Sequence, residues 1–129
     1  MKKNTSRYLL FALAITATGA ACDRDPLVAP VASTIGLSAE TTLLRPGEST
    51  ELMAIVTEEV GTAVHDGTVV RFVATLGRVE PQESKTKDGV ARATFTAGNV
   101  LGTARITALS GAAEPNVDLP NTFDIVIEN

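Results

Sequence analysis

The residues of this chain best suited to chemistry are one cysteine, Cys22, and one histidine, His65, among 129 residues. A nucleophilic triad needs a serine or cysteine beside a histidine and an acid. A zinc site needs several cysteine or histidine ligands at short spacing. His65 lies in a stretch typical of a turn, and no second cysteine or histidine accompanies either residue. The sequence therefore predicts that the protein is not an enzyme and that it holds no cofactor and no zinc.

Acidic side chains are the remaining candidates, because carboxylate oxygens are the ligands that Ca²⁺ prefers. They gather in residues 58–67, 87–89 and 111–121, and the last segment is the longest irregular stretch of the chain. The candidate partner-binding or ion-binding residues are Glu58, Glu59, His65, Asp66, Asp88, Glu114 and Asp118. The spacing of a known calcium loop is absent. A solvated or partner-facing surface is therefore the main interpretation, and a site for Ca²⁺ or carbohydrate is the alternative.

The first residues form a segment to be separated from the fold. Lys2, Lys3 and Arg7 make a basic start, and the uncharged run Tyr8–Ala21 follows. This run is shorter than the about 20 residues that span a bilayer. A basic start, a short apolar run and small residues at its end are typical of a secretory signal. We expect residues 1–21 to be a signal peptide and residues 22–33 to be a short extended tether.

Gly19, Ala20, Ala21 and Cys22 resemble the lipobox of bacterial lipoproteins, although that family prefers leucine where Gly19 stands. The resemblance implies that Cys22 becomes the first residue and carries diacylglycerol and further acyl chains such as palmitate, which together anchor a protein stably. The alternative is a secreted protein with a free thiol. The expected location is the bacterial cell envelope, lipid-anchored and facing the periplasm or the cell surface. Asp23 resembles the residue that favours inner-membrane retention in enterobacteria-like lipoproteins.

Charge and composition narrow the class of partner. Removal of the three basic residues of the signal leaves 8 of the 11 lysines and arginines against 15 acidic residues, a formal charge of −7. That charge argues against nucleic acid as a partner. The remaining aromatic residues are Phe72, Phe95 and Phe123, which the pattern places in a core, so no stacking platform for bases is expected.

From Thr34 onward the hydrophobic pattern has a period of two, which is the signature of half-buried strands. Inward positions are predicted in five windows: Leu52, Ala54 and Val56; Val70 and Phe72; Ala91, Ala93 and Phe95; Ala104, Ile106 and Ala108; Phe123, Ile125 and Ile127. Arg71, Arg92 and Arg105 alternate with them and are expected on solvated sheet faces. Arg105 is expected to pair across strands with Asp124 or Glu128.

Turn residues separate these windows, with Asp-Gly pairs in residues 65–68 and 87–90. Such pairs accept the positive φ angles of tight turns. Short strands with no helical period predict an all-β sandwich of about seven strands over residues 34–129. In immunoglobulin strand order the three acidic segments would share one pole of this sandwich.

The segments "GTVVRFVATLGRVEP" and "TKDGVARATFTAGNVLGTARITALSG" resemble bacterial Ig-like domains of group 1, the invasin and intimin type. The matching positions are Val70, Phe72, Gly77, Asp88, Gly89, Ala91, Gly102, Ala104, Ile106 and Ala108. The resemblance implies an Ig-like sandwich that serves in adhesion, protein contact or envelope structure, with a protein partner that the sequence does not name. Members of this family usually carry tandem copies, whereas this chain has one.

Overall fold

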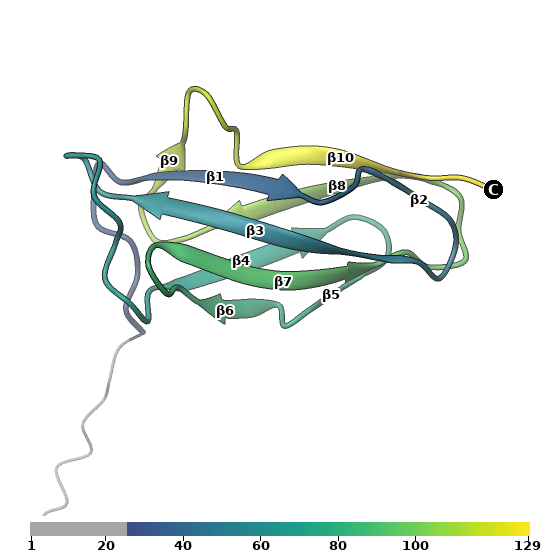
Figure 1. Cartoon of the computed structure of the whole chain (residues 1–129), viewed down its shortest axis with the longest axis horizontal. Helices are drawn as coiled ribbons and strands as arrows, with labels where there is room; N and C mark the ends of the chain where they lie inside the picture. Colours follow the sequence, from purple (N-terminus) through teal and green to yellow (C-terminus); the bar gives the residue numbers. More distant parts are fainter. Residues whose placement is uncertain (1–25) are drawn as a thin grey trace, which may run out of the picture.

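The computed structural model describes residues 26–129, which form two β-sheets packed face to face (Figure 1). The predicted all-β sandwich is confirmed. The ten strands are β1 (Thr34–Ala39), β2 (Leu43–Leu44), β3 (Ser49–Thr57), β4 (Val69–Ala74), β5 (Arg78–Glu80), β6 (Glu83–Lys85), β7 (Val90–Thr96), β8 (Gly102–Leu109), β9 (Glu114–Pro115) and β10 (Thr122–Ile127).

The strands form two five-stranded sheets, with the orders β5-β7-β3-β1-β9 and β2-β10-β8-β4-β6. The long neighbours pair antiparallel. Two short pairs are parallel, β1 with β9 and β2 with β10, and each joins an early strand to a late one. The β2–β10 pair is extended by bonds from the Val126 N–H to the Thr42 oxygen (2.8 Å) and from the Glu128 N–H to the Leu44 oxygen (3.0 Å).

The core lies between the two sheets and is built from the alternating positions of the long strands. Every predicted inward residue is buried except Phe123, which is half-buried and packs against the edge of the core. The core also contains Ile35 and Leu37 of β1. Burial of a full Leu, Ile or Phe side chain contributes about 1.5–3 kcal/mol. This one-sided burial is the physical reason that the period of two predicts the long strands.

Residues 78–85 cross from one sheet to the other and so provide an edge strand to both. β5 pairs with the second half of β7, and β6 pairs with the first half of β4. Gly77 precedes the crossing with a φ of 73°, and a Cβ at this position would lie 2.7 Å from the Phe95 ring. Glycine is therefore required at Gly77 both for its φ angle and for the close approach of the ring.

Close packing also fixes the loop that precedes β10. The Leu37 N–H donates to the Pro120 oxygen (3.0 Å), so this loop runs beside β1. The Leu119 side chain covers Gly36, where a Cβ would lie 2.7 Å from it. The loop therefore occupies the outer flank of β1, above the sandwich in Figure 1.

The segment expected to be a tether is, from Pro26 onward, part of the folded domain. The Val69 N–H donates to the Leu27 oxygen (2.7 Å), and the Ala112 N–H donates to the Ala29 oxygen (3.3 Å). Ala29 and Ser33 are buried. The domain thus begins before Thr34, because this segment closes the space between the start of β4 and the loop after β8.

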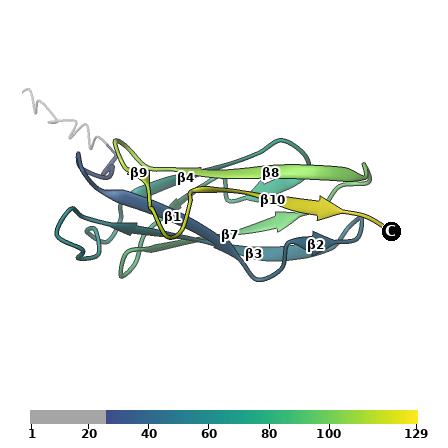
Figure 2. The same cartoon turned by 90° about the horizontal axis from the view of Figure 1, so that it is seen from above.

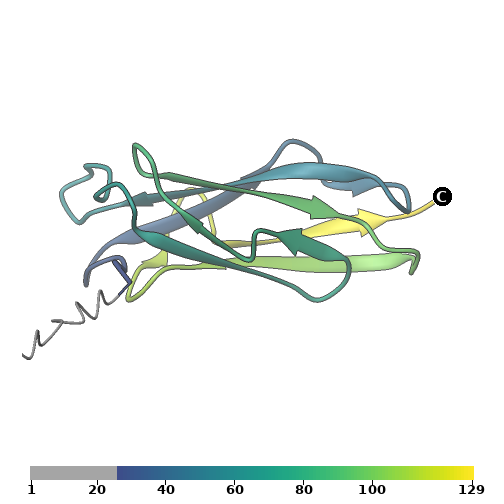
Figure 3. The same cartoon turned by 90° about the horizontal axis from the view of Figure 1, so that it is seen from below.

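The long axis of the sandwich separates the two ends of the described chain. We call the end that contains residues 26–33, 58–68 and 86–89 the N-terminal end, and the end that contains residues 45–48, 75–77, 97–101 and the C-terminus the C-terminal end. Figures 2 and 3 show this separation from above and below.

Candidate functional site

Cys22, the expected lipid-attachment residue, lies outside the described residues, as does the predicted signal peptide. The described chain enters the fold at the N-terminal end (Figure 1). No helix among residues 26–129 has the length and apolar character needed to cross a membrane.

The acidic candidates are distributed over the N-terminal end and its flank. Residues 58–68 and 86–89 lie together there, since the Gly67 N–H donates to the Thr86 oxygen (2.8 Å). Glu114 lies on β9 opposite Thr34 of β1. Asp118 belongs to the loop beside β1 and so lies on the flank, away from the tip.

Asp66 makes a side-chain contact that has no local signal in the sequence. Its Oδ1 accepts a hydrogen bond from the Asp88 N–H (2.8 Å). Asp88 and Gly89 have φ angles of 53° and 78°, and Lys87 and Val90 exchange backbone bonds across them. This is the two-residue hairpin turn that Asp-Gly favours. Asp66 therefore stabilises the β6–β7 turn from the neighbouring loop.

His65 contributes through its backbone. Its carbonyl oxygen accepts hydrogen bonds from the Thr68 hydroxyl (2.6 Å) and the Thr86 hydroxyl (3.0 Å). The Thr68 N–H also donates to it (3.2 Å), which closes a turn. Both threonines are buried, whereas the imidazole is exposed. These contacts fix the main chain at His65 and leave its side chain in solvent.

The acidic side chains do not converge on a common point. Among residues 26–129, no group of three or more His, Cys, Asp or Glu side chains is arranged to hold a metal ion. The shared end of the sandwich thus supplies a negatively charged surface, and the described geometry provides no ligand set for Ca²⁺.

The outward arginines lie on solvated sheet faces, and two of them have carboxylate partners across strands. Arg105 Nε donates to Asp124 Oδ1 (3.0 Å), and Arg92 pairs with Glu51. The hydrogen bond and the charge of Asp124 raise the pKa of Arg105 above its usual value. The predicted Arg105–Asp124 pair is therefore present, and it lies at a ladder position where the two residues face each other.

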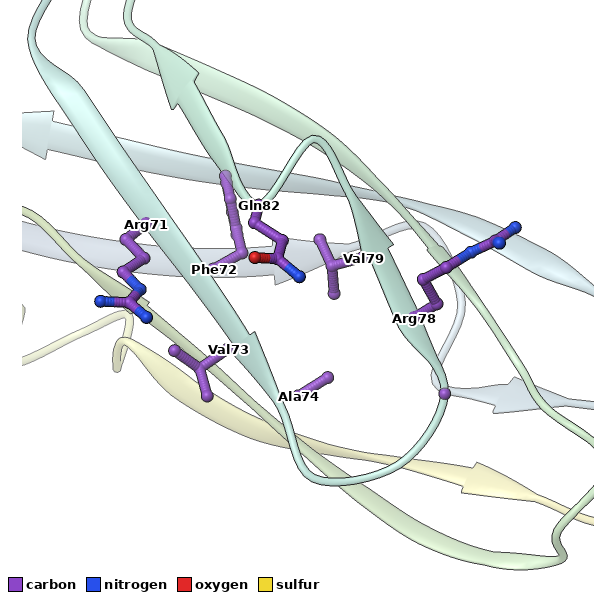
Figure 4. Close-up of a pocket in the computed structure, with 8 residues that line it drawn as sticks. Arg71, Phe72, Val73, Ala74, Arg78, Val79 and Gln82 are labelled. Carbon is purple, nitrogen blue, oxygen red and sulfur yellow. The ribbon is translucent and has the colours of Figure 1, made fainter.

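A cleft of about 220 Å³ lies where β5 diverges from β4 (Figure 4). Gln82 points into the space between these two strands, while Arg78 extends away from it and is paired with Glu80 (3.4 Å). The cleft exists because residues 78–85 cover only half of each sheet edge. Its lining includes Arg71 and Arg78, whose side chains extend to opposite sides of it in Figure 4.

Comparison with known proteins establishes the class of fold. No known protein family matches the chain by sequence, and no curated protein matches it. The D00–D0 domains of intimin superpose with a TM-score of 0.62 at 16% identity, and the match covers 78% of this chain and 50% of that one. The adhesin InvE of Yersinia pseudotuberculosis gives 0.57 at 22% identity, with coverages of 79% and 28%.

A glycosyl hydrolase family 2 member from Bacteroides cellulosilyticus also superposes, with a TM-score of 0.58 at 18% identity and coverages of 79% and 15%. The chain thus spans half or less of each of these proteins. The shared unit is an Ig-like β-sandwich of the kind found in intimin and invasin-type adhesins. The predicted resemblance is confirmed for the fold, and the same sandwich occurs within proteins of different activity.

Proposed function

We propose that this protein is a non-catalytic, lipid-anchored Ig-like module of the bacterial cell envelope that acts in protein contact or adhesion. The observation that carries the proposal is the separation of the two ends. The chain enters the fold at one end of the long axis, four residues after Cys22, and leaves it at the other. An anchor at Cys22 would hold the N-terminal end against a membrane and present the C-terminal end outward.

The fold shared with intimin domains and with the adhesin InvE supports the contact role. The C-terminal end also carries the exposed apolar side chains of Val100 and Leu101 before β8, and exposed Leu43 of β2 lies next to this end. Exposed apolar groups on a soluble domain are candidate contact points for another protein.

Replacement of Cys22 by serine tests the anchor. Serine removes the thiol that becomes acylated, so C22S should move from the membrane fraction to the soluble fraction and lose the mobility shift of the lipidated chain. A matched control is E59S, a substitution on the exposed surface of the domain that leaves Cys22 in place. If C22S stays with the membrane and keeps its mobility, the anchor is wrong.

A further inference from the structure

The docked segment that begins the described chain is apolar and exposed. Residues 26–33, "PLVAPVAS", contain no charged side chain. Ala29 and Ser33 are buried, whereas Leu27, Val28 and Val31 remain 46%, 49% and 83% exposed. The backbone is held in place by Val69 and Ala112, so these three side chains are fixed to the surface of the N-terminal end.

A second apolar tip extends beyond the same end. Thr34, the first residue of β1, lies directly opposite Thr57, the last residue of β3. The residues before Thr34 and after Thr57 therefore lie at the same end of these two strands. The Gly61 N–H donates to the Glu58 oxygen (2.8 Å), which closes a turn with Val60 at its tip. Val60 is 80% exposed.

The length of chain before Pro26 brings this surface close to the anchor. Only residues 23–25 separate Cys22 from the docked segment. Four steps of extended chain reach about 14 Å. Because residues 26–33 belong to the domain, no longer spacer is available to hold the domain away from the bilayer.

We infer that the N-terminal end is a membrane-contacting edge, in which Leu27, Val28, Val31 and Val60 touch the lipid bilayer that carries the anchor. This inference rests on the proposed function. Exposed apolar side chains that meet a bilayer move out of the water and into the boundary between the headgroups and the acyl chains. Glu58 and Glu59, which precede Val60, would stay in the aqueous headgroup layer. The loops of this end carry four acidic side chains, Glu58, Glu59, Asp66 and Asp88, against one lysine, Lys87. Because a net negative charge is repelled by anionic lipid, the surface suits a zwitterionic headgroup.

Site-specific fluorescence tests the inference on the full chain, produced with its acyl chains and reconstituted in phosphatidylcholine vesicles. V31C, V60C and V100C each receive an environment-sensitive maleimide dye. Val100, 64% exposed at the C-terminal end, is the matched control. We expect a blue-shifted emission and quenching by nitroxide-labelled lipid at positions 31 and 60, and neither effect at position 100.

The unsubstituted chain separates the two ways in which the experiment could fail. An acylated Cys22 takes no dye, and the chain floats with the vesicles. If the unsubstituted chain takes the dye and does not float, the anchor is wrong and the inference falls with it. If the chain floats but dyes at 31 and 60 stay as water-exposed as at 100, only the inference is overturned. If the dyes at positions 31 and 60 become exposed to water when the ratio of protein to lipid is lowered, a second copy of the chain covers them. That result would also overturn the inference.

Discussion

At the scale of the residue, the acidic candidates divide into side chains that stabilise the fold and side chains that stay in solvent. Asp66 accepts the Asp88 N–H, although the sequence suggested a role in partner or ion binding for both residues. The Asp-Gly turn itself was predictable, because φ preferences are local. The contact from Asp66 was not predictable, because it joins two loops whose proximity only the fold creates.

Replacement of Asp66 by alanine should lower the free energy of unfolding by about 1 kcal/mol, because the Asp88 N–H loses its acceptor. Asparagine retains an acceptor oxygen and should restore most of the loss. Urea unfolding followed by circular dichroism measures both variants. E59A, an exposed change in the same loop, serves as the control. Equal stabilities of D66A and E59A would show that the contact contributes nothing.

The Arg105–Asp124 pair should contribute little, because both side chains are largely exposed and exposed pairs are screened by water and salt. The folded pKa of Arg105 is raised above its unfolded value, so its contribution is fully present below the unfolded pKa and is lost only as pH rises through the folded pKa. We therefore expect R105E to shift the urea midpoint only slightly. The shift should be the same at pH 6 and pH 9. A large shift that D124R reverses would instead indicate a strong specific pair.

At the scale of the element, the alternating long strands were predictable, whereas β1, whose burial does not alternate, and the short strands were not. β3, β4, β7, β8 and β10 each bury one face, and the alternation of side chains records this burial. β2 and β9 have two residues each, so neither is long enough to show a period. Their strand geometry comes from parallel pairing with β10 and β1, which lie far away in the sequence.

The docked segment 26–33 was missed for a different reason. Two prolines and the absence of alternation are typical of a linker. The segment is nevertheless held by backbone bonds and by the close approach of Gly111, where a Cβ would lie 2.5 Å from the Ala29 carbonyl oxygen. The sequence held no specific signal for this docking, because proline-rich and glycine- or serine-rich spacers also lack charged residues.

Truncation tests where the domain begins. A chain that starts at Thr34 loses the burial of Ala29 and the bonds to Val69 and Ala112, each about 0.5–1.5 kcal/mol. We expect its free energy of unfolding to be about 2 kcal/mol lower than that of a chain that starts at Pro26. Its urea midpoint should be lower accordingly. Indistinguishable midpoints would restore the predicted boundary at residue 34 and the tether before it.

At the scale of the whole molecule, both ends of the sandwich carry charged and exposed apolar side chains. The N-terminal end combines the acidic loops with Val31 and Val60, and the C-terminal end combines Arg45 and Glu48 with Val100 and Leu101. The sequence indicated which loops could share a pole, because strand order dictates it. It did not indicate that this pole adjoins the start of the described chain through a docked segment.

Calcium provides a test at this scale. Because no three acidic side chains among residues 26–129 converge, millimolar CaCl₂ should leave the thermal midpoint unchanged relative to an equal ionic strength of NaCl. The NaCl reference removes general screening of the acidic surface. A rise of several degrees that is specific to Ca²⁺ and absent in D66N would show that the loops rearrange into a site.

The parallel β2–β10 pair has a mechanical consequence. A pull on the C-terminus of an anchored domain acts along the long axis, parallel to β10. The bonds that join β10 to residues 42–44 lie across that direction, so they are loaded together in shear and cannot be opened one at a time. In a chain anchored at Cys22, a load between the two ends would therefore be resisted in shear by these bonds together with the longer β8–β10 ladder, which would suit the module to holding a contact under tension.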